Sequence, residues 1–101
     1  MEQSLSKNNV PIRLPYERWV HITENHDDLS GYFDDILNAI EDPDWILKGY
    51  CTAFLAVKKF DVHKFLVVVY KEIDGKDGFV ITAYFTTKLK LNKEIILWQK
   101  R

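Results

Sequence analysis

The sequence has little cysteine, glycine or proline, and it has no long hydrophobic run. Its 101 residues include 1 Cys, 4 Gly and 3 Pro, which excludes an internal disulfide and a glycine- or proline-rich low-complexity chain. A single cysteine is typical of a reducing compartment, so we predict a cytoplasmic location. The longest apolar run, at residues 65–70, is far shorter than the roughly 20 residues of a membrane-spanning helix. The sequence therefore predicts no contact with a membrane.

Hydrophobic residues are abundant enough for a folded core. They make up 47% of the chain, and aromatic residues make up 14%, which at this length is typical of one small globular domain. Residues 1–15 are polar and lack the apolar stretch of a secretory signal. We therefore expect a flexible N-terminal tail over residues 1–15 and a single domain over residues 16–101.

Charge is distributed unevenly along the chain. Residues 1–47 contain 3 basic and 10 acidic side chains, and residues 48–101 contain 11 basic and 5 acidic ones, so a net charge of −1 combines −7 with +6. The acidic half offers a surface to a cationic partner, and the basic half offers one to an anionic partner. The alternative explanation is that the two kinds of charge simply lie on separate solvent-exposed faces. The basic C-terminal segment is expected to receive an acidic partner protein, or the acidic helix of a second copy in a homodimer.

Hydrophobic periodicity predicts helices followed by strands. Residues 16–26 fit a short amphipathic helix that begins after Pro15, and a second helix runs from a cap at Asp27 or Asp28 to a stop at Pro43. Runs rich in β-branched and aromatic residues predict strands near residues 45–48, 52–60, 64–72, 79–87 and 94–98. Short connections make neighbouring strands antiparallel. The expected fold is α+β, with two N-terminal helices on an antiparallel sheet of four to five strands.

The side chains that carry chemistry do not have the spacing of a metal site. His21 and His26 are five residues apart, about 140° around a helix, and no Cys or His pair has zinc-ligand spacing. We expect neither a metal nor a cofactor.

In the strand near 79–87 the odd positions are apolar and the even positions include hydroxyls, which predicts one packed face and one polar face.

A distributed set of side chains suits phosphodiester chemistry. It contains two histidines, two lysines and three hydroxyl groups: His21, His26, Lys58, Lys59, Thr82, Tyr84 and Thr86. Metal-free RNA cleavage requires a base for the 2′-hydroxyl, an acid for the leaving oxygen, and cations or hydroxyls for the phosphate. Histidine transfers protons near neutral pH. Surface residues without a role are the alternative interpretation of the same pattern.

Two strings in this order resemble a known nuclease superfamily. Residues 19–26 have the pattern Trp-x-His-Ile-x-x-x-His, and residues 81–84 read Ile-Thr-Ala-Tyr. Over about residues 16–98 the chain resembles the small phage and mobile-element members of the barnase, EndoU, colicin and RelE superfamily. The resemblance implies two helices on a curved antiparallel sheet, metal-independent RNA cleavage on the open sheet face, and a toxin-like role with a cognate antitoxin.

The resemblance also implies roles for individual residues. It makes His21 the acid or base, makes His26 a second histidine that orients the site or packs, and places Tyr84 or a threonine near the scissile phosphate. The catalytic set is then His21, His26, Tyr84 and Thr86, and the substrate-binding set is Lys58, Lys59 and Thr82. A non-catalytic module of the same fold that binds a protein or a nucleic acid is the main alternative. An antitoxin or subunit-interaction protein that uses the acidic helix is a further one.

Overall fold

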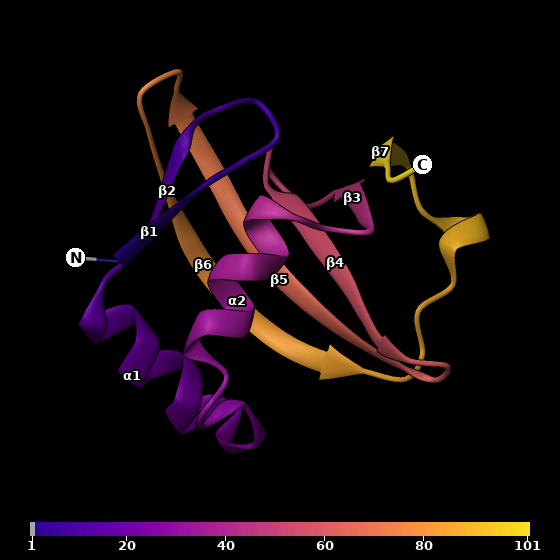
Figure 1. Ribbon diagram of the computed structural model, residues 1–101, viewed down its shortest axis with the longest axis horizontal. Coiled ribbons are helices and arrows are strands. Elements are labelled where there is room, and N and C mark those ends of the chain that lie inside the picture. Colours follow the sequence, from indigo (N-terminus) through magenta and orange to yellow (C-terminus); the bar gives the residue numbers. More distant parts are fainter. Residues whose placement is uncertain (1) are drawn as a thin grey trace.

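A seven-stranded mixed sheet is the main element of the computed structural model, which describes residues 2–101 (Figure 1). In spatial order its strands are β1 (Glu2–Leu5), β2 (Pro11–Leu14), β6 (Asp77–Thr86), β5 (Lys64–Asp74), β4 (Phe54–Asp61), β3 (Trp45–Lys48) and β7 (Ile96–Gln99). Neighbours are antiparallel except β2 and β6, which are parallel. The strand with the apolar run, β5, lies at the centre of the sheet.

Two helices cover one face of this sheet. Helix α1 (Tyr16–Asn25) contacts β6, and α2 (Phe33–Glu41) contacts β1, β4 and β5 (Figure 1). The second helix starts later than predicted from Asp27 or Asp28, because Gly31 has a φ of 92°, outside the helical region. The preceding residues form a separate 3₁₀ turn, η1 (Asp27–Leu29). No helix within residues 2–101 combines the length and apolar character needed to cross a membrane.

The segment before α1 overturns the prediction of two N-terminal helices on a sheet of four to five strands. Residues 2–14, which were expected to belong to a flexible tail over 1–15, form the hairpin β1–β2. Strand β2 pairs in parallel with the start of β6, at Ile12 with Gly78 and Arg13 with Phe79. Three apolar side chains of this segment are at most 3% exposed: Val10, Ile12 and Leu14. The hairpin is therefore part of the core, because these side chains pack beneath the helices.

A bulge in β6 decides which side chains share a face. The register with β5 shifts between Val69 and Tyr70, so that Ile81 has no partner. Val80 before the bulge and Ala83 after it are both fully buried in the core beneath the helices. Since side chains alternate along a regular strand, the extra residue changes the phase of the alternation. Phe79 therefore lies on the sheet face opposite the helices instead of packing with Ala83.

The face opposite the helices has a small core of its own. It consists of three buried side chains, Leu47, Val57 and Val67, with Tyr84 among the partly buried residues packed against them. The connection from β6 to β7 contains a 3₁₀ turn, η2 (Leu91–Lys93), and places Leu89 and Leu91 over this cluster. The open face is therefore partly covered by the C-terminal segment.

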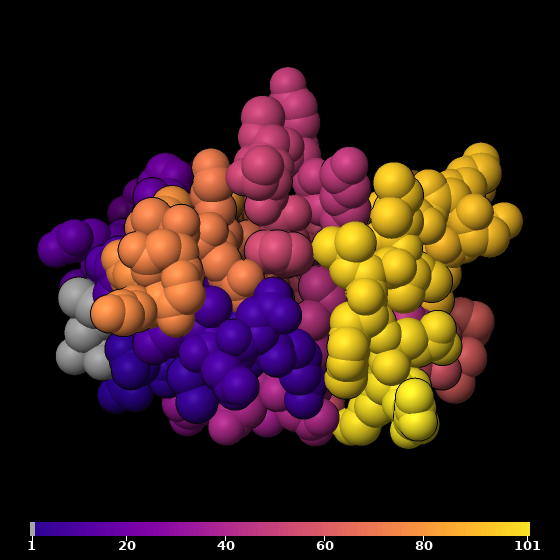
Figure 2. Space-filling model, turned by 90° about the horizontal axis from the view of Figure 1, so that it is seen from above, coloured from indigo at the N-terminus to yellow at the C-terminus, as the bar shows by residue number. Residues whose placement is uncertain are grey.

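The sheet curls until its two edge regions approach each other at one end. Lys7, in the β1–β2 turn, places its Nζ 5.0 Å from the ring centroid of Trp98 in β7, although β1 and β7 are at opposite ends of the strand order. Figure 2 shows the N-terminal segment in indigo beside the C-terminal segment in yellow. Strand β2 pairs with β6 only at Gly78 and Phe79, so within residues 2–101 most of β6 has no strand partner on that side.

Buried Tyr70 predicts a loss of stability in alkali. Its side chain is 1% exposed and its ring stacks on Phe54 at 5.4 Å between centroids. Burial, together with the negative charge of Glu72, raises the pKa of the Tyr70 phenol. Above pH of about 10 the unfolded chain loses this proton while the folded chain keeps it, so the free energy of unfolding falls as pH rises. Urea titrations between pH 8 and 11 are expected to show this decline.

The contribution of Tyr70 to that decline can be isolated by substitution. Tyr70→Phe removes the titrating group and is expected to flatten the alkaline decline. Tyr50→Phe is the matched control, because Tyr50 is 84% exposed and should leave the decline unchanged. Equal slopes for wild type and Tyr70→Phe would contradict the assignment to Tyr70.

Candidate functional site

Two surface depressions lie along β6, one near each end of the strand. Helix α1 runs beside the part of β6 that β2 leaves unpaired. The first depression includes Phe79 and the second includes Tyr84. Five residues separate these positions, which corresponds to roughly 17 Å along an extended strand. The bulge at Ile81 places both side chains on the face opposite the helices.

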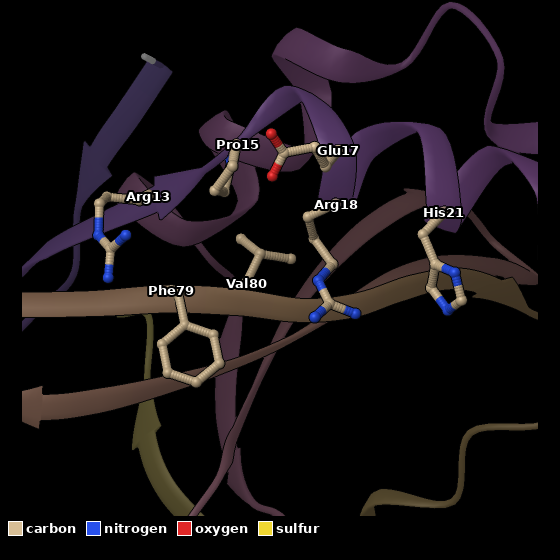
Figure 3. A pocket seen from close by; sticks show the side chains of 7 residues that line it. All are labelled: Arg13, Pro15, Glu17, Arg18, His21, Phe79 and Val80. Carbon is tan, nitrogen blue, oxygen red and sulfur yellow. The ribbon is translucent and has the colours of Figure 1, made fainter.

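The first depression, which we call the arginine–histidine depression, has a volume of about 450 Å³. It is lined by Arg13, Pro15, Glu17, Arg18, His21, Phe79 and Val80 (Figure 3). Residues 18 and 21 are three positions apart, so both lie on one face of α1. Figure 3 shows their side chains projecting from α1 in the same direction, toward β6. Helix α1 and strand β6 thus bring an arginine, an imidazole and an aromatic ring together.

The two arginines of this depression differ in whether they already form an ion pair within the protein. Arg13 forms a bidentate ion pair with Asp77, from Nε to Oδ1 at 2.8 Å and from Nη2 to Oδ2 at 3.0 Å. Within residues 2–101, Arg18 makes no ion pair. His21 is exposed, and its Nε2 lies 3.4 Å from Nδ2 of Asn25. Arg18 and His21 are therefore the groups of this depression that remain free to meet an anion.

The second depression, which we call the lysine groove, has a volume of about 320 Å³. It is lined by Leu55, Val67, Tyr84, Thr86, Lys88, Leu89, Lys90, Lys93 and Glu94. Burial, and then the negative charge of Glu94, raises the pKa of the Tyr84 phenol. Its hydroxyl is thus protonated at neutral pH and can donate a hydrogen bond. The groove combines an apolar floor with a cationic rim.

The predicted catalytic residues are divided between these two places. His21 lines the arginine–histidine depression, whereas Tyr84 and Thr86 line the lysine groove. His26 follows the end of α1, and its ring centroid lies 6.2 Å from that of Tyr84. The structure therefore brings His26 and Tyr84 together, and it places His21 and His26 at different points along β6.

The predicted substrate-binding residues lie outside both depressions. On the helix side, Lys58 Nζ donates to the backbone oxygen of Asp42 at 2.7 Å and to its Oδ2 at 3.1 Å. Hydrogen bonds from Lys100, and then from Lys58, hold the pKa of the Asp42 carboxyl below its usual range. Lys59 lines a separate hollow near the C-terminus, and Thr82 is half-buried opposite Val69. Their roles in binding a substrate stay predictions.

Sequence reasoning did not single out several residues that line the depressions. These are Arg13, Arg18 and Phe79 in the first and Lys88, Lys90 and Lys93 in the second. The sequence does indicate Arg18, because it precedes His21 by about one helical turn and so shares a helix face with it. No comparable signal marks Phe79, because the bulge that turns it toward the open face depends on pairing with β5.

Comparison with known proteins adds no assignment to this geometry. Within residues 2–101, no group of three His, Cys, Asp or Glu side chains is placed to hold a metal ion. The chain matches no known family model, no curated protein and no solved structure. The nuclease resemblance and the activity that it implies therefore stay predictions.

Proposed function

We propose that this protein is a metal-independent ribonuclease whose reaction takes place in the arginine–histidine depression. The observation that carries the proposal is the presence of Arg18, His21 and Phe79 in one depression of about 450 Å³. Arginine matches the geometry of a phosphate group, histidine transfers protons near neutral pH, and an aromatic ring offers a face for a base. Together they offer an RNA strand a phosphate contact, a proton-transfer group and a surface on which a base can stack.

The proposed reaction is an internal transfer of the phosphate. His21 accepts the proton of a ribose 2′-hydroxyl, and the 2′-oxygen attacks the adjacent phosphorus. The bond from phosphorus to the 5′-oxygen breaks, and the imidazolium of His21 returns a proton to that oxygen. The products are a 2′,3′-cyclic phosphate and a 5′-hydroxyl. Arg18 stabilises the negative charge that develops on the phosphate oxygens.

RNA binding without cleavage is a second proposal that one observation favours. Of the four predicted catalytic residues, only His21 lines this depression. A site with a single proton-transfer group and a free arginine is sufficient to bind a strand. The products of incubation with RNA separate the two proposals, because only a nuclease releases cyclic phosphate ends.

The direct test is incubation of the purified protein with a single-stranded RNA in the presence of EDTA. Wild-type protein is expected to release fragments with 2′,3′-cyclic phosphate ends. Fragments that appear only when a divalent metal ion is supplied, or that have other ends, would reject the proposed reaction. Intact RNA that nevertheless binds the protein would favour the second proposal.

Arg18 provides a residue-specific prediction for the same assay. Arg18→Gln is expected to lower kcat/KM for cleavage by about 10- to 100-fold, since a charge-assisted contact to the phosphate is lost. Arg18→Lys keeps the charge without the planar fork and should retain an intermediate rate. The control is Arg101→Gln, which removes the same charge at the far end of the chain and should leave cleavage unchanged. Equal rates for Arg18→Gln and wild type would contradict the role of Arg18.

A further inference from the structure

The lysine groove takes no part in the proposed reaction, yet it has the character of a binding site. Lys88, Lys90 and Lys93 contribute three positive charges, and within residues 2–101 none of them forms an ion pair. Glu94 is the one acidic side chain in the lining. The rim thus has a net charge of about +2, which attracts an anionic ligand.

The floor of the groove indicates which kind of anion fits. Leu55, Val67 and Leu89 form an apolar surface that belongs to the smaller core. Beside it lies the half-buried Tyr84, whose hydroxyl is a donor at neutral pH. A planar base fits against an apolar and aromatic surface, while lysines meet the phosphates on either side of it. A volume of about 320 Å³ is within the usual range for small-ligand sites.

We propose that the lysine groove binds one nucleotide of a single-stranded RNA whose scissile bond lies at His21, an inference that rests on the proposed function. Both depressions open along β6, at roughly 17 Å from Phe79 to Tyr84. His26 follows His21 by five residues and its ring lies 6.2 Å from that of Tyr84, so the groove lies within a few nucleotides of the reacting phosphate. The substrate is then a single strand that extends beyond the cleaved bond.

The groove is tested first by binding, with no cleavage required. The probe is a fluorescent RNA of about ten nucleotides with 2′-O-methyl groups throughout, which removes the attacking hydroxyl. The triple variant Lys88→Ala, Lys90→Ala and Lys93→Ala is expected to bind at least about tenfold more weakly. The slope of log affinity against log salt should fall by about 1.4, since the contacts to the two flanking phosphates each contribute about 0.7 for a single strand.

Matched variants distinguish the groove from general charge. The triple variant Lys7→Ala, Lys48→Ala and Lys76→Ala also removes three exposed lysines and should bind the probe nearly as wild type does. Glu94→Gln removes the negative charge from the rim and should tighten binding several-fold. Equal losses in the two triple variants, or no effect of Glu94→Gln and of the groove lysines, would overturn the proposal. So would tighter binding of an acidic peptide than of RNA to the wild-type groove.

Cleavage assays separate this proposal from the proposed function. For the groove-lysine variant, kcat/KM on an RNA of about ten nucleotides should fall about tenfold, while kcat/KM on a dinucleotide should equal that of wild type. An equal loss on both substrates would reject a distant subsite. If wild type cleaves neither substrate but binds the probe through these lysines, the ribonuclease proposal fails and the RNA site in the groove stands.

Discussion

A chain that lacks residues 2–14 is expected to lose its cooperative fold. The deletion removes three side chains that are at most 3% exposed: Val10, Ile12 and Leu14. Burial of one such side chain contributes about 1.5–3 kcal/mol, so the three together contribute about 5–9 kcal/mol. The whole free energy of unfolding of a small domain is about 5–15 kcal/mol. Circular dichroism with urea should therefore show no folded baseline for the truncated chain.

Point substitutions in the same hairpin make this expectation specific. Ile12→Ala removes most of a fully buried side chain and is expected to lower the free energy of unfolding by about 2–5 kcal/mol. Leu5→Ala is the control, because Leu5 is 48% exposed and its change should stay within about 0.5 kcal/mol. A truncated chain that unfolds cooperatively at the wild-type urea midpoint would show that residues 2–14 are dispensable.

The difference between this result and the predicted tail has a physical cause. The strands after α2 are recognisable locally, as in the apolar run of residues 65–70, which lies in the central strand β5. Strands β1 and β2 have four residues each, and β1 is mostly polar. These two strands are held in place because β2 pairs with Gly78 and Phe79, far along the chain, and because apolar side chains of the hairpin pack beneath the helices. A non-local contact of this kind leaves little trace in local periodicity.

For the candidate site, the sequence predicted several of the lining side chains but not how they are grouped. The helical spacing of α1 sets His21 apart from the apolar side chains of that helix, and the structure places it at a surface depression. The polar positions Tyr84 and Thr86 likewise share one groove. The two sets lie apart because they line depressions near different ends of β6, which sequence spacing does not reveal. The contact of Lys58 with Asp42 likewise depends on where the chain leaves α2.

Replacing His21 should nearly abolish cleavage of RNA while leaving the fold intact. General acid–base catalysis by one positioned side chain contributes about 10²- to 10⁴-fold to a rate, so His21→Asn is expected to lower kcat by at least about 100-fold. The side chain is exposed at the surface of α1, so the urea midpoint should remain close to that of wild type. The measurement is single-turnover cleavage of an RNA in EDTA.

The control for this substitution is His63→Asn, since His63 is an exposed histidine in the β4–β5 turn that lines neither depression. Its rate should equal that of wild type, and an equal loss in both variants would indicate a contaminating nuclease or a general effect. RNA affinity offers a second readout: if His21 transfers protons and Arg18 binds the phosphate, His21→Asn keeps its affinity and Arg18→Gln loses it. A His21→Asn variant that cleaves at the wild-type rate would leave binding without catalysis as the function of the depression.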